Sequence, residues 1–321
     1  YSYGGEGDLH RHYDSCKKNP GHKNFIPVDK FSVEDLPEDY RDKNVVNYIR
    51  AVSDLTVRVT VNYVSDKRPA TAPGSQKPYP YYNVRGQRKM TAGTGWVSGV
   101  LISRNALRGL CQCKDCLNSS TPEENYAIIS IDTAAHVVFD DLEGEHTICD
   151  LFFDRGDNPY TNSSVVALTG VSGVQTRVVE DFCYREHYTH DMDLAQRLQE
   201  IMYHNFQEKG HFYCEMLSLF KVTQRRDILL KPTLLFLVSH PHGCSKKVSL
   251  GRATRVNVFN DRIVSVLYNT ASCPGSSGAH VGMLQMDEDV KGISEYKPER
   301  RVHRGFYDVR RGINFCYENT G

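Results

Sequence analysis

The feature that most constrains the fold is a succession of short apolar segments of strand length, each bounded by polar or glycine-rich turns. Residues 55–64 alternate between apolar and polar side chains, which is typical of a strand with one buried face. Further strands are predicted at 95–103, 127–131, 147–153, 164–169, 174–182, 233–239, 246–250, 254–259 and 262–268. This many short strands favours a β-sandwich or a β-barrel.

Two segments depart from the strand pattern. Residues 32–54 follow a polar arm and predict a helix with acidic residues near its start. Residues 193–207 predict an amphipathic helix. We therefore expect an arm and helix over 1–54, a first β unit over 55–210 with a cysteine-rich insert at 104–125, and a second β unit over 211–321.

Charge and hydropathy limit the classes of partner. The 321 residues include 39 Lys and Arg and 39 Asp and Glu, so the formal net charge is zero. This balance gives no reason to expect nucleic acid or an anionic membrane as a partner. No stretch approaches the length of about 18 apolar residues that predicts a membrane span.

Residues 275–280, Gly-Ser-Ser-Gly-Ala-His, are the strongest candidate for a functional turn. Gly-x-Ser-Gly can present a serine hydroxyl on a tight turn, which makes Ser277 a candidate nucleophile. The backbone N–H groups of Gly275 and Ser277 could then stabilise the oxyanion of an acyl-transfer intermediate. A serine nucleophile also needs a base, and His136, after an apolar strand and two alanines, is the best candidate among 13 histidines.

In their order along the chain, these segments resemble the trypsin-like serine proteases. Residues 133–138 (Thr-Ala-Ala-His-Val-Val) are similar to the family's histidine motif, 93–103 to the strand before it, and 271–278 to its nucleophile motif. Residues 239–251 are similar to a strand pair of the HtrA-type branch. The resemblance covers about residues 55–300 and implies two perpendicular, six-stranded antiparallel β-barrels with an active site between them.

The same resemblance implies a serine endopeptidase that acts on polypeptides and needs no cofactor for catalysis. It places the acid of the triad at Asp193, within 188–195 (Tyr-Thr-His-Asp-Met-Asp-Leu-Ala), with Asp191 as the alternative acid. Asp193 could instead cap the helix together with Gln196. A shifted alignment would bring Glu215 or a methionine to the position of the acid.

Departures from the family pattern refine these expectations. Val137 replaces a cysteine of secreted relatives, and no leader is visible, which favours the cytoplasm over secretion. Ser276 replaces the aspartate used in zymogen activation, so we expect no activation by trimming. Ala271, which the resemblance places at the base of the primary specificity pocket, predicts a preference for apolar or uncharged side chains. His280 replaces a common proline and could either shape the substrate side or have no role.

Cys111, Cys113 and Cys116 form a compact knuckle in the insert. With a fourth ligand such as Cys149, Cys183 or His146, the knuckle could hold a structural zinc ion. Disulfides to Cys149 or Cys183, or unbonded buried thiols, are the alternatives.

Two other functions remain open for this chain. The first is a catalytically inactive binding module on the protease fold, since fold does not dictate activity. The second is a scaffold that presents the cysteine knuckle and the N-terminal arm to a partner protein.

Overall fold

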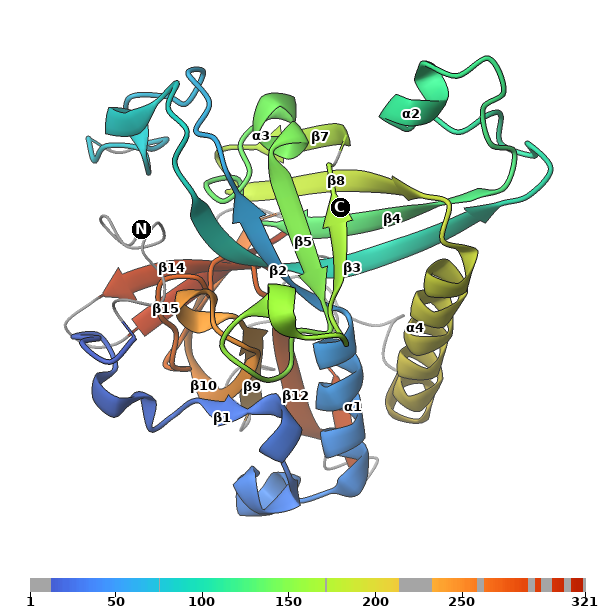
Figure 1. The fold of residues 1–321 in the computed structure, drawn as a ribbon. Helices are drawn as coiled ribbons and strands as arrows, with labels where there is room; N and C mark the ends of the chain where they lie inside the picture. Colours follow the sequence, from blue (N-terminus) through green and yellow to red (C-terminus); the bar gives the residue numbers. More distant parts are fainter. Residues whose placement is uncertain are drawn as a thin grey trace.

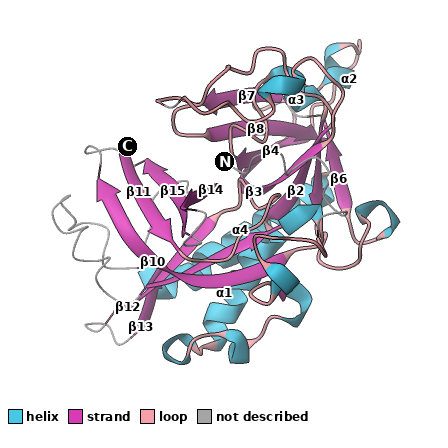
Figure 2. Ribbon diagram, turned by 90° about the vertical axis from the view of Figure 1, so that its left-hand side faces the viewer, coloured by secondary structure: helices cyan, strands magenta, loops and turns pink. Residues whose placement is uncertain are grey.

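The chain folds into two antiparallel sheets (Figure 1). The computed structural model describes residues 13–74, 76–170, 172–213, 233–258, 263–287, 292–295, 302–308 and 313–319. Within these ranges one sheet has seven strands and the other eight. The first sheet occupies the upper half of Figure 1. Figure 2 shows the second sheet at the left and the first sheet at the upper right.

The first sheet has the strand order β6-β5-β2-β3-β4-β8-β7. Its strands are β2 (Thr56–Val61), β3 (Thr91–Ser103), β4 (Tyr126–Thr133), β5 (Thr147–Leu151), β6 (Val166–Thr169), β7 (Ser172–Arg177) and β8 (Phe182–Thr189). The single strand predicted at 174–182 is wrong, because the chain turns between β7 and β8 at residues 178–181. This turn matters for the site described below.

The second sheet has the order β13-β12-β9-β10-β11-β15-β14, and β1 pairs with β10. Its strands are β1 (Ile26–Pro27), β9 (Thr233–Ser239), β10 (Lys247–Val258), β11 (Ile263–Tyr268), β12 (Val281–Asp287), β13 (Gly292–Glu295), β14 (Val302–Asp308) and β15 (Ile313–Asn319). The strands predicted at 246–250 and 254–259 are one strand, β10, with a register shift between Ala253 and Arg255. The mostly β, two-sheet architecture is thus confirmed, with seven and eight described strands instead of six in each unit.

Strand β2 differs from the prediction of one buried face. All six of its residues are buried. Arg58, on the face predicted to be polar, is 4% exposed, and its Nη1 lies 3.6 Å from Asp150 Oδ2 of β5. The polar face of β2 is therefore part of the interior.

The N-terminal helix is shorter than predicted. Helix α1 spans Lys43–Asp54, and Asp42 caps it by accepting a hydrogen bond from the Asn44 N–H at 2.7 Å. Residues 33–35 and 38–40 form separate 3₁₀ turns. Pro37 explains the break, because a proline disfavours helical geometry in the residue before it, and Leu36 is extended with ψ 145°.

The other helices are α2 (Lys114–Leu117), α3 (Asp141–Glu145) and α4 (Met192–Tyr213). Helix α4 confirms the amphipathic helix predicted at 193–207, and its apolar residues Leu194 and Leu198 pack into the core of the first sheet. Helix α1 instead packs its Val45, Ile49 and Val52 against the second sheet. Among the described helices, none has both the length and the apolar character needed to cross a membrane.

Candidate active site

His136 lies in the tight turn that follows β4. The N–H groups of Val137 and Val138 point to the Ala134 carbonyl oxygen, at N···O distances of 3.0 and 3.3 Å, which closes the turn. Ala134 and Ala135 are fully buried, and His136 is 3% exposed. The small residues before the histidine let the main chain approach Gly278 closely.

The acidic partner of His136 is Asp181, in the turn between β7 and β8. Its Oδ2 lies 2.8 Å from His136 Nδ1, and its Oδ1 accepts a hydrogen bond from the His136 backbone N–H at 3.0 Å. Because an ionised carboxylate only accepts, the imidazole hydrogen sits on Nδ1, and Nε2 is left to accept a proton. Asp181 has a φ of 49°, a left-handed conformation that aspartate tolerates better than most residues.

Arg304, on β14 of the second sheet, contacts the same carboxylate. Its Nε lies 3.3 Å from Asp181 Oδ2, and its Nη2 donates to the Val179 carbonyl at 3.2 Å. Burial by itself raises the pKa of the Asp181 carboxyl, but the charges of His136 and Arg304 and the hydrogen bonds from His136 outweigh it and lower the pKa to about 2. Asp181 is therefore ionised at neutral pH and links the two sheets.

The structure does not bring Asp193 or Asp191 to His136, so the expectation that either one orients this histidine is wrong. Strand β8 runs antiparallel to β4, so that it begins beside the His136 turn and ends beside the start of β4. At about 3.4 Å per residue, the two ends of β8 are roughly 24 Å apart. Asp181 precedes the near end of β8, whereas Asp191 and Asp193 follow its far end.

The two aspartates at the far end serve helix α4. Asp191 Oδ1 accepts a hydrogen bond from the Leu194 N–H at 2.9 Å, which makes Asp191 the N-cap. Asp193 is exposed in the first helical turn. Glu215, the acid of the shifted alignment, lies outside the described residues.

The sequence did contain a weak signal for Asp181. Two adjacent carboxylates, Glu180 and Asp181, interrupt an otherwise β-type stretch from 172 to 189. Charged residues in the middle of such a stretch indicate a turn. A turn there places Asp181 at the start of the strand that pairs with β4, which carries His136 at its end.

The Ser277 turn depends on two glycines in left-handed conformations. Gly275 has φ 91° and Gly278 has φ 89°. A Cβ at Gly275 would collide with the His240 carbonyl, and one at Gly278 would collide with the Thr94 carbonyl. Only glycine therefore fits at either position, and Ser277 between them is 6% exposed.

Both sheets hold this turn in place. Thr94 of β3 donates from its N–H to the Ser277 carbonyl at 2.8 Å and from its Oγ1 to the Gly275 carbonyl at 2.7 Å. The Gly278 N–H donates to the His303 carbonyl of β14 at 2.8 Å. Within the described residues, the N–H groups of Gly275 and Ser277 have no hydrogen-bond acceptor.

The turns of His136 and Ser277 meet on β3. A Cβ placed on Gly93 would lie 2.6 Å from Val137 Cγ1 and 3.1 Å from the Ser277 carbonyl oxygen. A Cβ on Gly278 would lie 3.0 Å from the Ala134 nitrogen. The residues next to His136 are thus in contact with the residues next to Ser277, although the two come from different sheets.

Two residues beside Ser277 have definite contacts. The Ser276 Oγ lies 3.0 Å from the Ser239 Oγ and accepts a hydrogen bond from the Cys273 N–H at 3.2 Å, so uncharged groups fix it inside the protein. The His280 ring stacks on Trp96 with centroids 4.5 Å apart. His280 therefore packs against β3.

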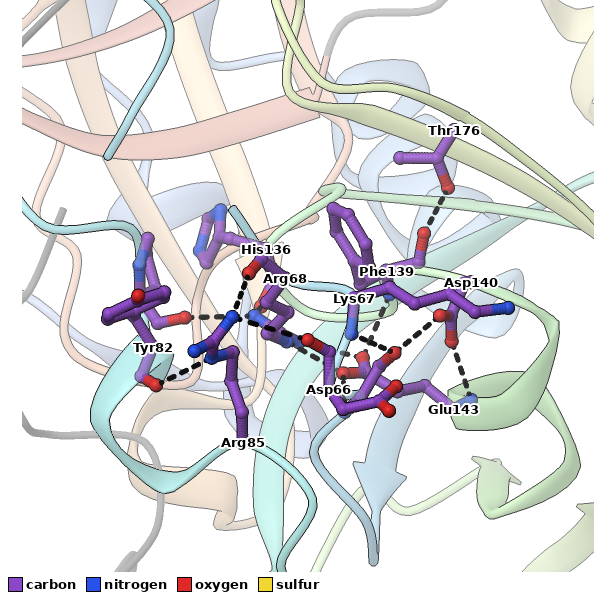
Figure 3. A network of polar contacts seen from close by, with 12 residues as sticks. Asp66, Lys67, Arg68, Tyr82, Arg85, His136, Phe139, Asp140, Glu143 and Thr176 are labelled. Atoms are coloured by element: carbon purple, nitrogen blue, oxygen red, sulfur yellow. Dashed lines mark hydrogen bonds and ion pairs between the residues drawn. The ribbon is translucent and has the colours of Figure 1, made fainter. Parts of the chain in front are cut away.

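A buried ion pair between Arg68 and Glu143 holds the main chain of His136 in place (Figure 3). Arg68 donates through Nε and Nη2 to the two carboxylate oxygens of Glu143, at 2.6 and 2.7 Å, and through Nη1 to the His136 carbonyl at 3.0 Å. Glu143 also accepts from the backbone N–H groups of Ser65 and Phe139. Arg68 and Glu143 are 1% and 0% exposed. This pair joins the 66–90 loop, helix α3 and the His136 turn.

The cysteine knuckle lies at the other end of β8, and its fourth member is His190. The His190 Nε2 lies 3.3 Å from Cys111 Sγ, 3.6 Å from Cys113 Sγ and 3.4 Å from Cys116 Sγ. Tetrahedral zinc with its usual bond lengths would separate a sulfur from a nitrogen by about 3.6 Å. These four side chains could therefore hold a metal ion.

The other predicted partners of the knuckle are engaged elsewhere. Cys149 and Cys183 lie in the core of the first sheet, and Cys149 Sγ accepts a hydrogen bond from Arg185 at 3.3 Å. The His146 ring packs on Tyr63, with centroids 5.3 Å apart. All nine cysteines in the described part of the chain are free thiols, so none of the disulfides considered is present among them.

No family model matches the chain, and no curated protein matches it at a significant level. The function is therefore inferred from the geometry of the site.

We expect Asp181 to stabilise the fold in a pH-dependent way. Since its pKa of about 2 lies below the ordinary 3.8, its contribution is present above about pH 4 and is lost as pH falls towards 2. The difference corresponds to about 2 kcal/mol. Urea unfolding of the wild type and Asp181→Asn should therefore show a stability gap at about pH 5 that narrows at about pH 3. The exposed Asp193→Asn is the control, and a gap that does not change with pH would contradict this assignment.

Proposed function

We propose that this protein is a serine endopeptidase that cleaves peptide bonds through an acyl-enzyme intermediate. The observation that carries the proposal is the buried Asp181–His136 pair, with Nδ1 turned to the carboxylate, in a turn that contacts the Ser277 turn. This order of acid, base and hydroxyl is the arrangement that activates a serine.

Each residue has a defined part in the proposed reaction. His136 Nε2 takes the proton from the Ser277 hydroxyl as its oxygen attacks the substrate carbonyl, and then gives it to the leaving amine. Asp181 keeps the imidazole in the Nδ1–H tautomer and stabilises the imidazolium. Water then attacks the acyl-enzyme, with His136 again acting as the base.

The backbone of the nucleophile turn provides the oxyanion donors. The N–H groups of Gly275 and Ser277, which have no acceptor among the described residues, would donate to the oxyanion, and each such donor is worth roughly 3 kcal/mol in other enzymes. Ala271 is partly buried against Cys16, Phe25 and Cys273. The predicted preference for uncharged side chains rests on the absence of a carboxylate at this position.

The first test is covalent labelling. A fluorophosphonate probe should label the wild type at Ser277, and Ser277→Ala should lose the label. Ser276→Ala is a matched control, because its hydroxyl is fixed inside the protein by Ser239 and Cys273. Equal labelling of Ser277→Ala and the wild type would exclude Ser277 as the nucleophile.

The second test identifies the acid. Asp181→Asn should lower kcat for cleavage of a denatured protein on the order of 10⁴-fold, since an amide no longer enforces the reactive tautomer. Asp193→Asn should keep wild-type activity. A large loss in Asp193→Asn with little loss in Asp181→Asn would reverse the assignment. Circular dichroism of both variants separates loss of folding from loss of catalysis.

One observation favours a second candidate, a non-catalytic binding module. Arg304 contacts the same Asp181 oxygen as His136 Nδ1. This ion pair reduces the support that the carboxylate gives to an imidazolium. A folded wild type that takes up no probe, while Arg304→Gln does, would support this second function.

We also propose that the cysteine knuckle and His190 bind a structural zinc ion. Four protein ligands leave no open coordination position, so the ion would hold the insert to the end of β8 and take no part in catalysis. Elemental analysis should show one zinc atom per chain fewer in Cys113→Ser than in the wild type. Cys183→Ser, in the core of the first sheet, should keep the full content. Unchanged zinc in Cys113→Ser would refute the site.

A further inference from the structure

A second cluster of cysteine and histidine residues lies beside the Ser277 turn. Cys16 and His22 come from the N-terminal segment, His242 from the 3₁₀ turn Pro241–Gly243 after β9, and Cys273 from the segment just before the nucleophile turn. The four are 8%, 5%, 2% and 2% exposed. One ligand atom from each lies within 4.8 Å of all the others.

The separations fit one tetrahedral ion. Cys16 Sγ lies 3.6 Å from Cys273 Sγ, and Cys273 Sγ lies 3.6 Å from His22 Nε2. Usual zinc bond lengths in a tetrahedron place two sulfurs about 3.8 Å apart and a sulfur and a nitrogen about 3.6 Å apart. A disulfide would need its sulfurs at about 2.05 Å. The Cys16 and Cys273 thiols are thus spaced as two ligands of the same metal ion.

The groups around the cluster orient its members. Asn19 donates from its backbone N–H to Cys16 Sγ at 3.4 Å and from its side chain to Cys273 Sγ at 3.2 Å. Tyr13 stacks on the His22 ring at 4.0 Å and meets the His242 ring edge-on at 5.8 Å. Hydrogen bonds to ligand atoms commonly orient the ligands of a metal ion, and here the ring contacts also limit rotation of the two imidazoles.

We propose that Cys16, His22, His242 and Cys273 bind one zinc ion that fastens the N-terminal segment to the nucleophile loop. Two thiolates and two neutral imidazoles balance the charge of Zn²⁺, which suits a buried site. All four positions are filled by protein, so the ion is structural. Binding releases the two thiol protons to solvent.

The ion would join segments that already touch through side-chain packing and hydrogen bonds. The His242 N–H donates to the Pro274 carbonyl at 2.5 Å, and Asn19 Nδ2 donates to the Ser272 carbonyl at 2.8 Å. Both acceptors lie in the loop that leads to Ser277. We therefore expect loss of the ion to loosen that loop and reduce Ser277 labelling, a consequence that rests on the proposed serine chemistry, whereas the metal site itself does not.

The deciding experiment is zinc analysis of the full chain, purified under reducing conditions. Cys16→Ser and His22→Asn should each hold one zinc atom per chain fewer than the wild type. Cys244→Ser is the matched control, because it lies in the same loop as His242 but outside the cluster. Cys113→Ser removes only the knuckle site and should retain the zinc of this cluster.

Three results would overturn the inference. They are unchanged zinc content in Cys16→Ser, no zinc in folded Cys113→Ser, and a Cys16–Cys273 disulfide in peptides mapped without reduction. If Cys16→Ser does not fold, the absorption spectrum of Cys113→Ser loaded with Co²⁺ is the decisive measurement. Bands of tetrahedral Co²⁺ with charge transfer from two thiolates would support the site, and their absence would refute it. The zinc content could change as expected in these variants while the fluorophosphonate probe labels no form of the protein. That result would reject the proposed serine chemistry and leave the zinc site supported.

Discussion

The ionised carboxylate of Asp181 is the constraint on which the rest of the site depends. It is buried, and a buried charge is unfavourable unless charged and hydrogen-bonding groups surround it. His136 supplies two of those groups from the first sheet, and Arg304 supplies the third from the second sheet. The carboxylate is therefore satisfied only when the two sheets are packed together, so the same contacts assemble the fold and orient the histidine.

The rest of the candidate site is held by strand β3 and by the loop behind His136. Gly93 and Thr94 bring the histidine turn and the serine turn against one strand, because only glycine leaves room for both. The Arg68–Glu143 pair then fixes the His136 main chain from the opposite side. The His136 and Ser277 turns are thus held from several directions, and the proposed stabilisation of an oxyanion would need such preorganised groups.

The two cysteine–histidine clusters lie where regular structure is sparse. One joins the 104–125 insert to the end of β8, and the other joins the N-terminal segment to the loop before Ser277. Metal binding is coupled to folding, so ligation can fix segments that strand pairing does not hold. The proposed ions would thus hold these loops in place, as hydrogen bonds between strands hold the two sheets.

The sequence by itself determined the strand-rich, two-unit architecture, the amphipathic helix after residue 192, and the histidine and serine turns with their small flanking residues. These features depend on residues that are close together in the sequence, so they can be predicted from local patterns. Tertiary structure decided that Asp181, not Asp193, faces His136, because the antiparallel register of β8 with β4 sets which end of the strand is near. It also decided that His190 completes the knuckle and that Cys16 meets Cys273, since residues far apart in sequence are brought together only by strand pairing and packing.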